Sequence, residues 1–264
     1  MQQVPLVRLA DFRSLRVIPL ATLVALAACN VDSVSGPDLL SPSYARGGKP
    51  KPPPPPPPTI THVPILFVHG YNGSSTTWTT MISRFKTDGY IDAELANWTY
   101  DYSKSNRTTA QLIKTKIDSI LLATGASQVN IITHSMGTIS VRYYIDSLGG
   151  ASKVNAFAGL GATNHGTSLA SFCFTTSCVE MRPGSTLLNH LNAIDESPFT
   201  VGYSTWRSPC DEAVSPHDSP ILAGLNLPEQ NYETVCMSHS QLHEDLTVYQ
   251  QVKLFIETDF AASP

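Results

Sequence analysis

One short segment constrains the fold more than any other, because an apolar run leads through a serine between small residues into a helix-like stretch. The run is Val129-Asn130-Ile131-Ile132, the turn is Thr133-His134-Ser135-Met136-Gly137, and the helix-like stretch covers residues 138–148. A strand, a sharp turn and a helix in this order form a nucleophile elbow, which lifts a serine hydroxyl out of a sheet. The unpaired N–H groups at the start of the helix point at the same place. The segment therefore predicts an α/β fold with Ser135 at the carboxyl end of a strand.

Apolar runs alternate with longer amphipathic stretches from residue 60 to about residue 258, and this length suits one domain with a sizeable core. We predict strands over residues 63–68, 97–102, 129–133, 154–160, 199–206 and 232–236. Helices are predicted over residues 76–88, 107–123, 138–148 and 242–256. Strands and helices in alternation indicate a mostly parallel sheet of about six strands with helices on both faces. Residues 60–264 are therefore predicted to be a compact α/β domain.

The first 28 residues predict an export signal that is not part of the fold. Arg8, Arg13 and Arg16 precede an apolar run, residues 17–28, that is too short to span a bilayer. This run ends in Leu26-Ala27-Ala28-Cys29, which resembles the lipobox of bacterial lipoprotein signal peptides. The resemblance implies cleavage before Cys29 and lipid attachment to that cysteine. A plain secretory signal is the alternative, and both interpretations predict an exported protein, either a cell-envelope lipoprotein or extracellular.

Residues 29–59 are predicted to form a spacer, because they are rich in Ser, Pro, Gly and Lys and have little to bury. They end in seven consecutive prolines, 52–58, which favour an extended polyproline II rod about 20 Å long. Such a rod would hold a domain away from a membrane, whereas a docking site for a Pro-binding domain suits an exported chain less well. The formal net charge of −4 comes without a basic stripe and argues against nucleic-acid binding. No obligatory protein partner is evident.

The elbow predicts that a carboxylate and then a histidine follow Ser135 in the chain, because this is the order of triads on such sheets. Asp211 comes shortly after the predicted strand 199–206, and His239 follows the predicted strand 232–236 by three residues. We therefore predict Ser135 as nucleophile, Asp211 as the acid that orients the base, and His239 as general base. The less suitable candidates are His217 and His243 for the base, and Glu212, Asp218 and Asp195 for the acid. His243 is expected to be solvated or to cap the last helix, and Glu212 to point elsewhere.

An oxyanion hole is predicted from two backbone N–H groups. One is that of Met136, directly after the serine, and the other is that of Tyr71 in the loop His69-Gly70-Tyr71-Asn72-Gly73. His69 is expected to support this loop and not to transfer protons.

The chain has five cysteines, and setting Cys29 aside as the lipid site leaves an even number for an oxidising compartment. Four cysteines permit three pairings. We favour Cys173–Cys178, which closes a short loop, and Cys210–Cys236, which would tie the loop of Asp211 to that of His239. A purely stabilising role of the second bridge is equally compatible with the spacing.

Taken together, the chain resembles the small bacterial triacylglycerol lipases of the lipase A-like (class 2) group in the α/β-hydrolase superfamily. The motifs that carry the resemblance, in chain order, are 69–73 (His-Gly-Tyr-Asn-Gly), 134–137 (His-Ser-Met-Gly), 161–167 (Gly-Ala-Thr-Asn-His-Gly-Thr), 210–212 (Cys-Asp-Glu) and 238–239 (Ser-His). The resemblance implies hydrolysis of lipid carboxylic esters with medium or long acyl chains and without a cofactor. We predict no metal among the site residues, and whether calcium supports a loop stays open. Thr133 departs from the pattern, because a glycine is usual at that place in the elbow.

Residues 168–192 leave two interpretations open. Their apolar side chains are suited to a lid or to a wall of an acyl pocket, and equally to a disulfide-pinned connection that covers the core. Other activities of the same triad also stay open, namely a short-chain carboxylesterase, a polyester depolymerase, an amidase or an acyltransferase. A surface-anchored binding lipoprotein is a remote alternative, which would predict a missing triad member.

Overall fold

The computed structural model describes residues 56–198, 200–224 and 230–260. Contacts divide the chain into two units, Met1–Pro53 and Pro54–Pro264, and all described residues belong to the second. The predicted signal peptide, Cys29 and most of the predicted spacer lie outside the described residues. Within the described ranges, no helix is long and apolar enough to cross a membrane.

The described part of the chain contains one six-stranded sheet in the order β2-β1-β3-β4-β5-β6, and every neighbouring pair is parallel. The strands are β1 (Ile65–Val68), β2 (Leu95–Ala96), β3 (Val129–His134), β4 (Val154–Leu160), β5 (Gly202–Arg207) and β6 (Asn231–Glu233). Three of the four inner strands, β1, β3 and β4, are buried along their whole length. Burial on both faces explains why they are nearly continuous apolar runs in the sequence.

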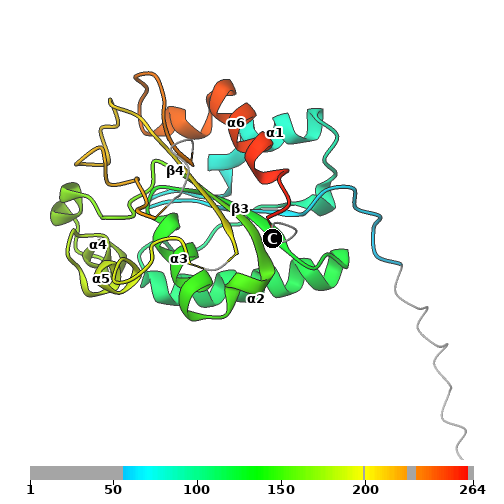
Figure 1. Cartoon of the computed structure of the whole chain (residues 1–264), viewed down its shortest axis with the longest axis horizontal. Helices are drawn as coiled ribbons and strands as arrows, with labels where there is room; N and C mark the ends of the chain where they lie inside the picture. The colour runs from blue at the N-terminus through cyan, green and yellow to red at the C-terminus, as the bar shows by residue number, and fades with distance from the viewer. Residues whose placement is uncertain (1–55, 199, 225–229, 261–264) are drawn as a thin grey trace, which may run out of the picture. The chain divides into compact units, whose positions relative to one another are not determined.

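Two layers of helices cover the sheet (Figure 1). On one face, α1 (Thr79–Thr87) and α6 (Leu246–Ile256) share a buried cluster with the sheet, to which Phe85, Val252 and Phe67 of β1 contribute. On the other face, α2 (Asn106–Thr124) and α3 (Gly137–Ser147) form a second cluster with the alternate residues of β1 and β3. The predicted α/β-hydrolase architecture, with helices on both faces of a parallel sheet, is confirmed.

Local sequence accounts for the longest helix. The hydroxyl of Ser105 accepts the N–H of Arg107 at 3.2 Å and caps the start of α2, and Gly125, with φ of 74°, ends it. Between these ends, Ile113 and Ile117 recur at helical spacing and are fully buried. The prediction of residues 107–123 misses this helix by one residue at each end.

The predicted strand over residues 97–102 is wrong, because the edge strand β2 ends at Ala96. Tertiary contacts draw the following residues away from the sheet. Asn97 donates its side-chain N–H to the carbonyl of Ser75 at 2.8 Å, and the ring of Tyr100 stacks on that of His69 with centroids 3.9 Å apart. Residues 97–102 therefore support the loop after β1 and do not extend the sheet.

The last strand and helix are shorter than predicted. β6 ends at Glu233, and α6 begins at Leu246 because the carboxylate of Asp245 accepts the N–H of Val248 at 3.0 Å and caps it. A short 3₁₀ helix, Ser240–His243, precedes α6. Similarly, the first predicted helix, 76–88, is a 3₁₀ turn, Ser75–Trp78, followed by α1.

Candidate active site

Ser135 lies in the turn between β3 and α3 in a left-handed conformation, with φ of 56°. This conformation costs a non-glycine residue on the order of 1–3 kcal/mol, so the surroundings must hold it. The N–H of Ser135 donates to the carbonyl of Leu160 at 2.9 Å, and its own carbonyl accepts the N–H and the hydroxyl of Thr138 at 3.1 and 2.8 Å. The turn is therefore fixed by β4 on one side and by α3 on the other, with the serine side chain half-buried.

Thr133 fits the crowded turn because Gly137 has no side chain. A methyl group built on Gly137 would lie 2.5 Å from the carbonyl oxygen of His69 and 2.7 Å from Oγ1 of Thr133. The threonine thus occupies space that the second glycine of the elbow leaves open. The departure at Thr133 does not disturb the strand–turn–helix geometry.

Asp211 and His239 form a buried pair at the carboxyl ends of β5 and β6. Nδ1 of His239 donates to Oδ2 of Asp211 at 2.8 Å, and Asp211 is 3% exposed. The other carboxylate oxygen accepts the N–H groups of Ala213 and Val214 at 2.9 and 3.0 Å. Because a carboxylate oxygen without a proton only accepts, the proton in the Asp211–His239 bond lies on Nδ1, and Nε2 of a neutral ring is left as the acceptor.

The loops that bear Asp211 and His239 are tied together by covalent and polar contacts. The structure contains the disulfide Cys210–Cys236, with Cα atoms 5.0 Å apart. The hydroxyl of Ser208 donates to the carbonyl of Met237 at 2.6 Å and accepts the N–H of the same residue at 2.9 Å. Asp211 and His239 are therefore held relative to each other independently of their own hydrogen bond.

The serine turn and His239 meet at the end of β4. His134, the residue before Ser135, lies with its ring centroid 4.3 Å from that of His239. A methyl group built on Gly161 would lie 2.9 Å from Nδ1 of His239, and the preceding residue, Leu160, accepts the N–H of Ser135. The fold thus brings Ser135, Asp211 and His239 to the carboxyl ends of the strands, where parallel sheets bind their ligands.

The loop after β1 lies directly against the serine. A methyl group built on Gly70 would lie 2.6 Å from Cβ of Ser135. Nε2 of His69 accepts the N–H of Tyr100 at 3.3 Å, so its Nδ1 carries the proton and donates to the carbonyl of Gly70 at 2.9 Å. The hydroxyl of Tyr100 donates to the carbonyl of His69. These bonds occupy both ring nitrogens of His69, as expected for a residue that supports the loop.

Comparisons with known proteins agree with this arrangement. A sequence model of the family "Lipase (class 2)" matches residues 62–253. The chain belongs to the class 2 lipase family. Among solved structures, it is similar to Bacillus licheniformis lipase BlEst2 in its mature form, with a TM-score of 0.63 and 19% identity over 78% of this chain and 96% of that one. Aspergillus fumigatus lipase B gives a TM-score of 0.63 and 16% identity over 75% of this chain, which spans 53% of the fungal chain.

The family places the molecule among lipolytic ester hydrolases, and the two structural likenesses show the α/β-hydrolase fold. The resemblance inferred from the motifs is thereby confirmed.

Two expectations about residues near Ser135, Asp211 and His239 are wrong. His243 is not solvated but 8% exposed, because the 3₁₀ helix turns it inward, and its ring lies edge-on to that of His134 at 4.8 Å. This burial lowers the pKa of His243 below its ordinary value. Glu212 does not point elsewhere, since its carboxylate accepts the main-chain N–H of His239 at 3.0 Å. The remaining candidates lie exposed on the surface, namely Asp195, His217 and Asp218.

Residues 168–192 fold into α4 (Thr176–Glu180), α5 (Thr186–Leu191) and a 3₁₀ turn over the start of α3. They form a buried cluster with Met136 and Ile139, to which Leu187 and Leu188 contribute. The disulfide Cys173–Cys178 closes the first part of the segment. The carboxylate of Glu180 accepts the hydroxyl of Ser105 and the N–H of Asn106, both at 2.6 Å, and so joins α4 to the start of α2. The segment both covers the core and borders the serine turn.

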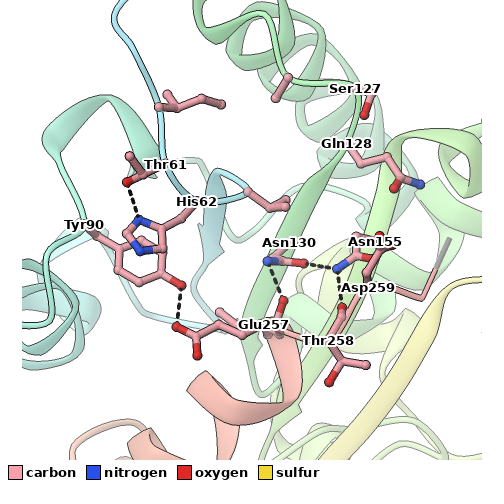
Figure 2. A pocket seen from close by; sticks show the side chains of 14 residues that line it. Thr61, His62, Tyr90, Ser127, Gln128, Asn130, Asn155, Glu257, Thr258 and Asp259 are labelled. Carbon is pink, nitrogen blue, oxygen red and sulfur yellow. Dashed lines mark hydrogen bonds between the residues drawn. The ribbon is translucent and has the colours of Figure 1, made fainter. Parts of the chain in front are cut away.

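A cavity of about 580 Å³ lies near the amino ends of the strands (Figure 2). Asn130 and Asn155 line it from the beginnings of β3 and β4, and the side-chain N–H of Asn155 donates to the side-chain oxygen of Asn130 at 2.9 Å. Because Ser135 follows the other end of β3, this cavity is separate from the proposed catalytic residues. Within the described ranges, no group of three or more His, Cys, Asp or Glu residues is arranged to hold a metal ion.

Proposed function

We propose that this class 2 lipase hydrolyses lipid carboxylic esters, triacylglycerols among them, through an acyl-enzyme on Ser135. The observation that carries the proposal is the buried Asp211–His239 pair beside the strained serine turn. Nε2 of His239 takes the proton of the serine hydroxyl as Oγ attacks the ester carbonyl, and Asp211 stabilises the imidazolium. The N–H groups of Tyr71 and Met136 are proposed to hold the oxyanion.

The second half of the reaction uses the same groups. The imidazolium of His239 protonates the leaving alcohol, and the neutral ring then takes a proton from the water that attacks the acyl-enzyme. The bond between the acyl carbon and Oγ then breaks, and the imidazolium of His239 returns its proton to Oγ, which releases the carboxylic acid and restores Ser135 and neutral His239.

Exposed apolar side chains in the segment that borders the serine turn support the proposal of an apolar substrate. Phe172 and Phe174 are 82% and 84% exposed on either side of Cys173, and Leu169 is 42% exposed. Neighbouring residues of the same segment form the buried cluster with Met136, directly after the serine. Such a grouping of exposed apolar side chains favours contact with an apolar partner, here the acyl chains of a lipid.

We further propose that the protein is exported and anchored through lipid on Cys29, with residues 60–264 as the catalytic domain. The apolar run with its lipobox-like end supports this, and so do two disulfides, which persist in oxidising compartments. Incorporation of labelled palmitate that is lost in Cys29→Ser would support anchoring. Export without any label would indicate a plain secretory signal.

The proposed activity is tested by hydrolysis rates of p-nitrophenyl esters of increasing acyl length, with Ser135→Ala as control. Turnover that peaks at medium or long chains and is lost in the variant would support a lipase. A peak at short chains would favour a carboxylesterase, and turnover that does not depend on Ser135 would refute the mechanism.

A further inference from the structure

We propose that His134 is a positioning residue for the base: it donates its Nε2–H to the main-chain carbonyl of His239 and thereby fixes the base loop relative to the serine turn. This inference rests on the proposed function, in which His239 is the base. The two atoms are 3.1 Å apart. Because a carbonyl oxygen only accepts, the proton in this bond belongs to His134.

The bond joins two parts of the site that are far apart in the chain. His134 ends β3 and is bonded covalently to Ser135, whereas His239 lies 105 positions later in a loop before the 3₁₀ helix. Moving His239 away from the serine would break this bond. A contact with one end in the serine turn is therefore suited to set the distance between nucleophile and base.

The other polar groups of His239 are held by a different element. Its main-chain N–H donates to Glu212 and its ring Nδ1 donates to Asp211, both in the loop after β5. These two bonds fix the base relative to the acid but not relative to the serine. His134 supplies the attachment to β3.

His134 is suited to this part because it stays neutral. It is enclosed by the rings of His239 and His243, and burial, together with these neighbours and the more distant His69, lowers its pKa well below the ordinary value. A neutral ring keeps one N–H for the carbonyl and places no second positive charge beside the imidazolium of His239.

The experiment compares His134→Leu, which removes the donor, with His134→Gln, which keeps an N–H at a similar distance from Cβ. Asn130→Leu is the matched control, since buried Asn130 lies in the same strand and donates to a distant carbonyl, that of Ile256, at 2.9 Å. Each full-length variant is titrated with a p-nitrophenyl alkylphosphonate to count reactive serines. Turnover per reactive serine and KM are then measured with a p-nitrophenyl ester.

We expect kcat per reactive serine to fall about 10²-fold in His134→Leu, with KM little changed, because small displacements of catalytic groups have effects of this size. His134→Gln should recover kcat to within about tenfold of the wild type, and Asn130→Leu should leave it unchanged. The proposal is overturned if His134→Leu lowers only the melting temperature or the fraction of reactive serines, as a purely structural residue would.

A second readout separates this proposal from the proposed function. The downfield proton resonance of the His239 Nδ1–H, identified by its loss in His239→Ala, requires no substrate. A shift or broadening in His134→Leu that His134→Gln reverses supports the positioning role even if the wild type hydrolyses no ester. An unchanged resonance together with unchanged kcat refutes it.

Discussion

Replacing Asp211 with asparagine is predicted to abolish most of the activity while leaving the fold intact. The side chains have the same shape, so the outcome depends on which way the new amide faces. One carboxylate oxygen accepts two N–H groups, those of Ala213 and Val214, and the other accepts Nδ1–H of His239. An –NH₂ group placed toward the two backbone amides would leave both without an acceptor, at about 1–3 kcal/mol each.

The amide oxygen of Asp211→Asn therefore takes the place next to the backbone, and its –NH₂ faces His239. Nδ1 of the imidazole then has to accept, and the ring proton moves to Nε2. A ring that carries its proton on Nε2 cannot take the proton of Ser135. A triad that keeps its geometry but holds this tautomer loses about 10⁴-fold in kcat.

The assay is kcat for a p-nitrophenyl ester together with thermal unfolding. Asp211→Asn should lose activity with little change in melting temperature. Asp211→Ala should lose both, because the N–H groups of Ala213 and Val214 are then left without their acceptor. An asparagine variant that keeps more than about a tenth of the wild-type kcat would refute the tautomer argument.

Three further outcomes are expected. Gly70→Ala should lower kcat about 10²-fold, measured with the ester assay, because its methyl group would lie 2.6 Å from Cβ of Ser135 and push the proposed oxyanion loop away. Replacing both Cys210 and Cys236 by serine should lower the free energy of unfolding by about 3.5 kcal/mol, since the bridged residues are 26 positions apart. Thermal unfolding should then show a melting temperature about 10 °C lower, and an unchanged melting temperature would contradict this. Glu94 is fully buried, and although burial raises its pKa, hydrogen bonds from Ile91, His62 and Thr61 lower it from 4.5 to about 2. Ionised Glu94 thus adds about 3 kcal/mol to the free energy of unfolding above pH 4.5, and this contribution is lost as the pH falls toward 2. Denaturant unfolding measured against pH should show this loss in the wild type and not in Glu94→Gln.

The sheet could be predicted from the sequence because its inner strands are buried on both faces. Residues 154–160 form a strand with the predicted bounds, because a short apolar run between two amphipathic helices is typical of a buried parallel strand. The elbow could also be predicted from the sequence, because the strand, the small residues and the helix are contiguous in the chain.

The errors have a common cause in contacts between distant segments. Residues 97–102 carry the aromatic and β-branched side chains of a strand, but Tyr100 packs on His69 and leaves the sheet. His243 is polar and close to a helix, yet the 3₁₀ helix turns it toward His134.

The contacts of Glu212 and His134 with His239 are made to its main chain. A residue pattern carries no signal for such bonds.

The proposed mechanism requires Ser135 to be the nucleophile, and covalent labelling of the active serine tests this requirement. The full-length protein would be treated with a p-nitrophenyl alkylphosphonate, and the modified residue located by peptide mass spectrometry. The account predicts one phosphonyl group on Ser135, loss of ester hydrolysis in proportion to labelling, and no label in Ser135→Ala. A label on another residue, or continued ester hydrolysis by protein fully labelled on Ser135, would contradict it.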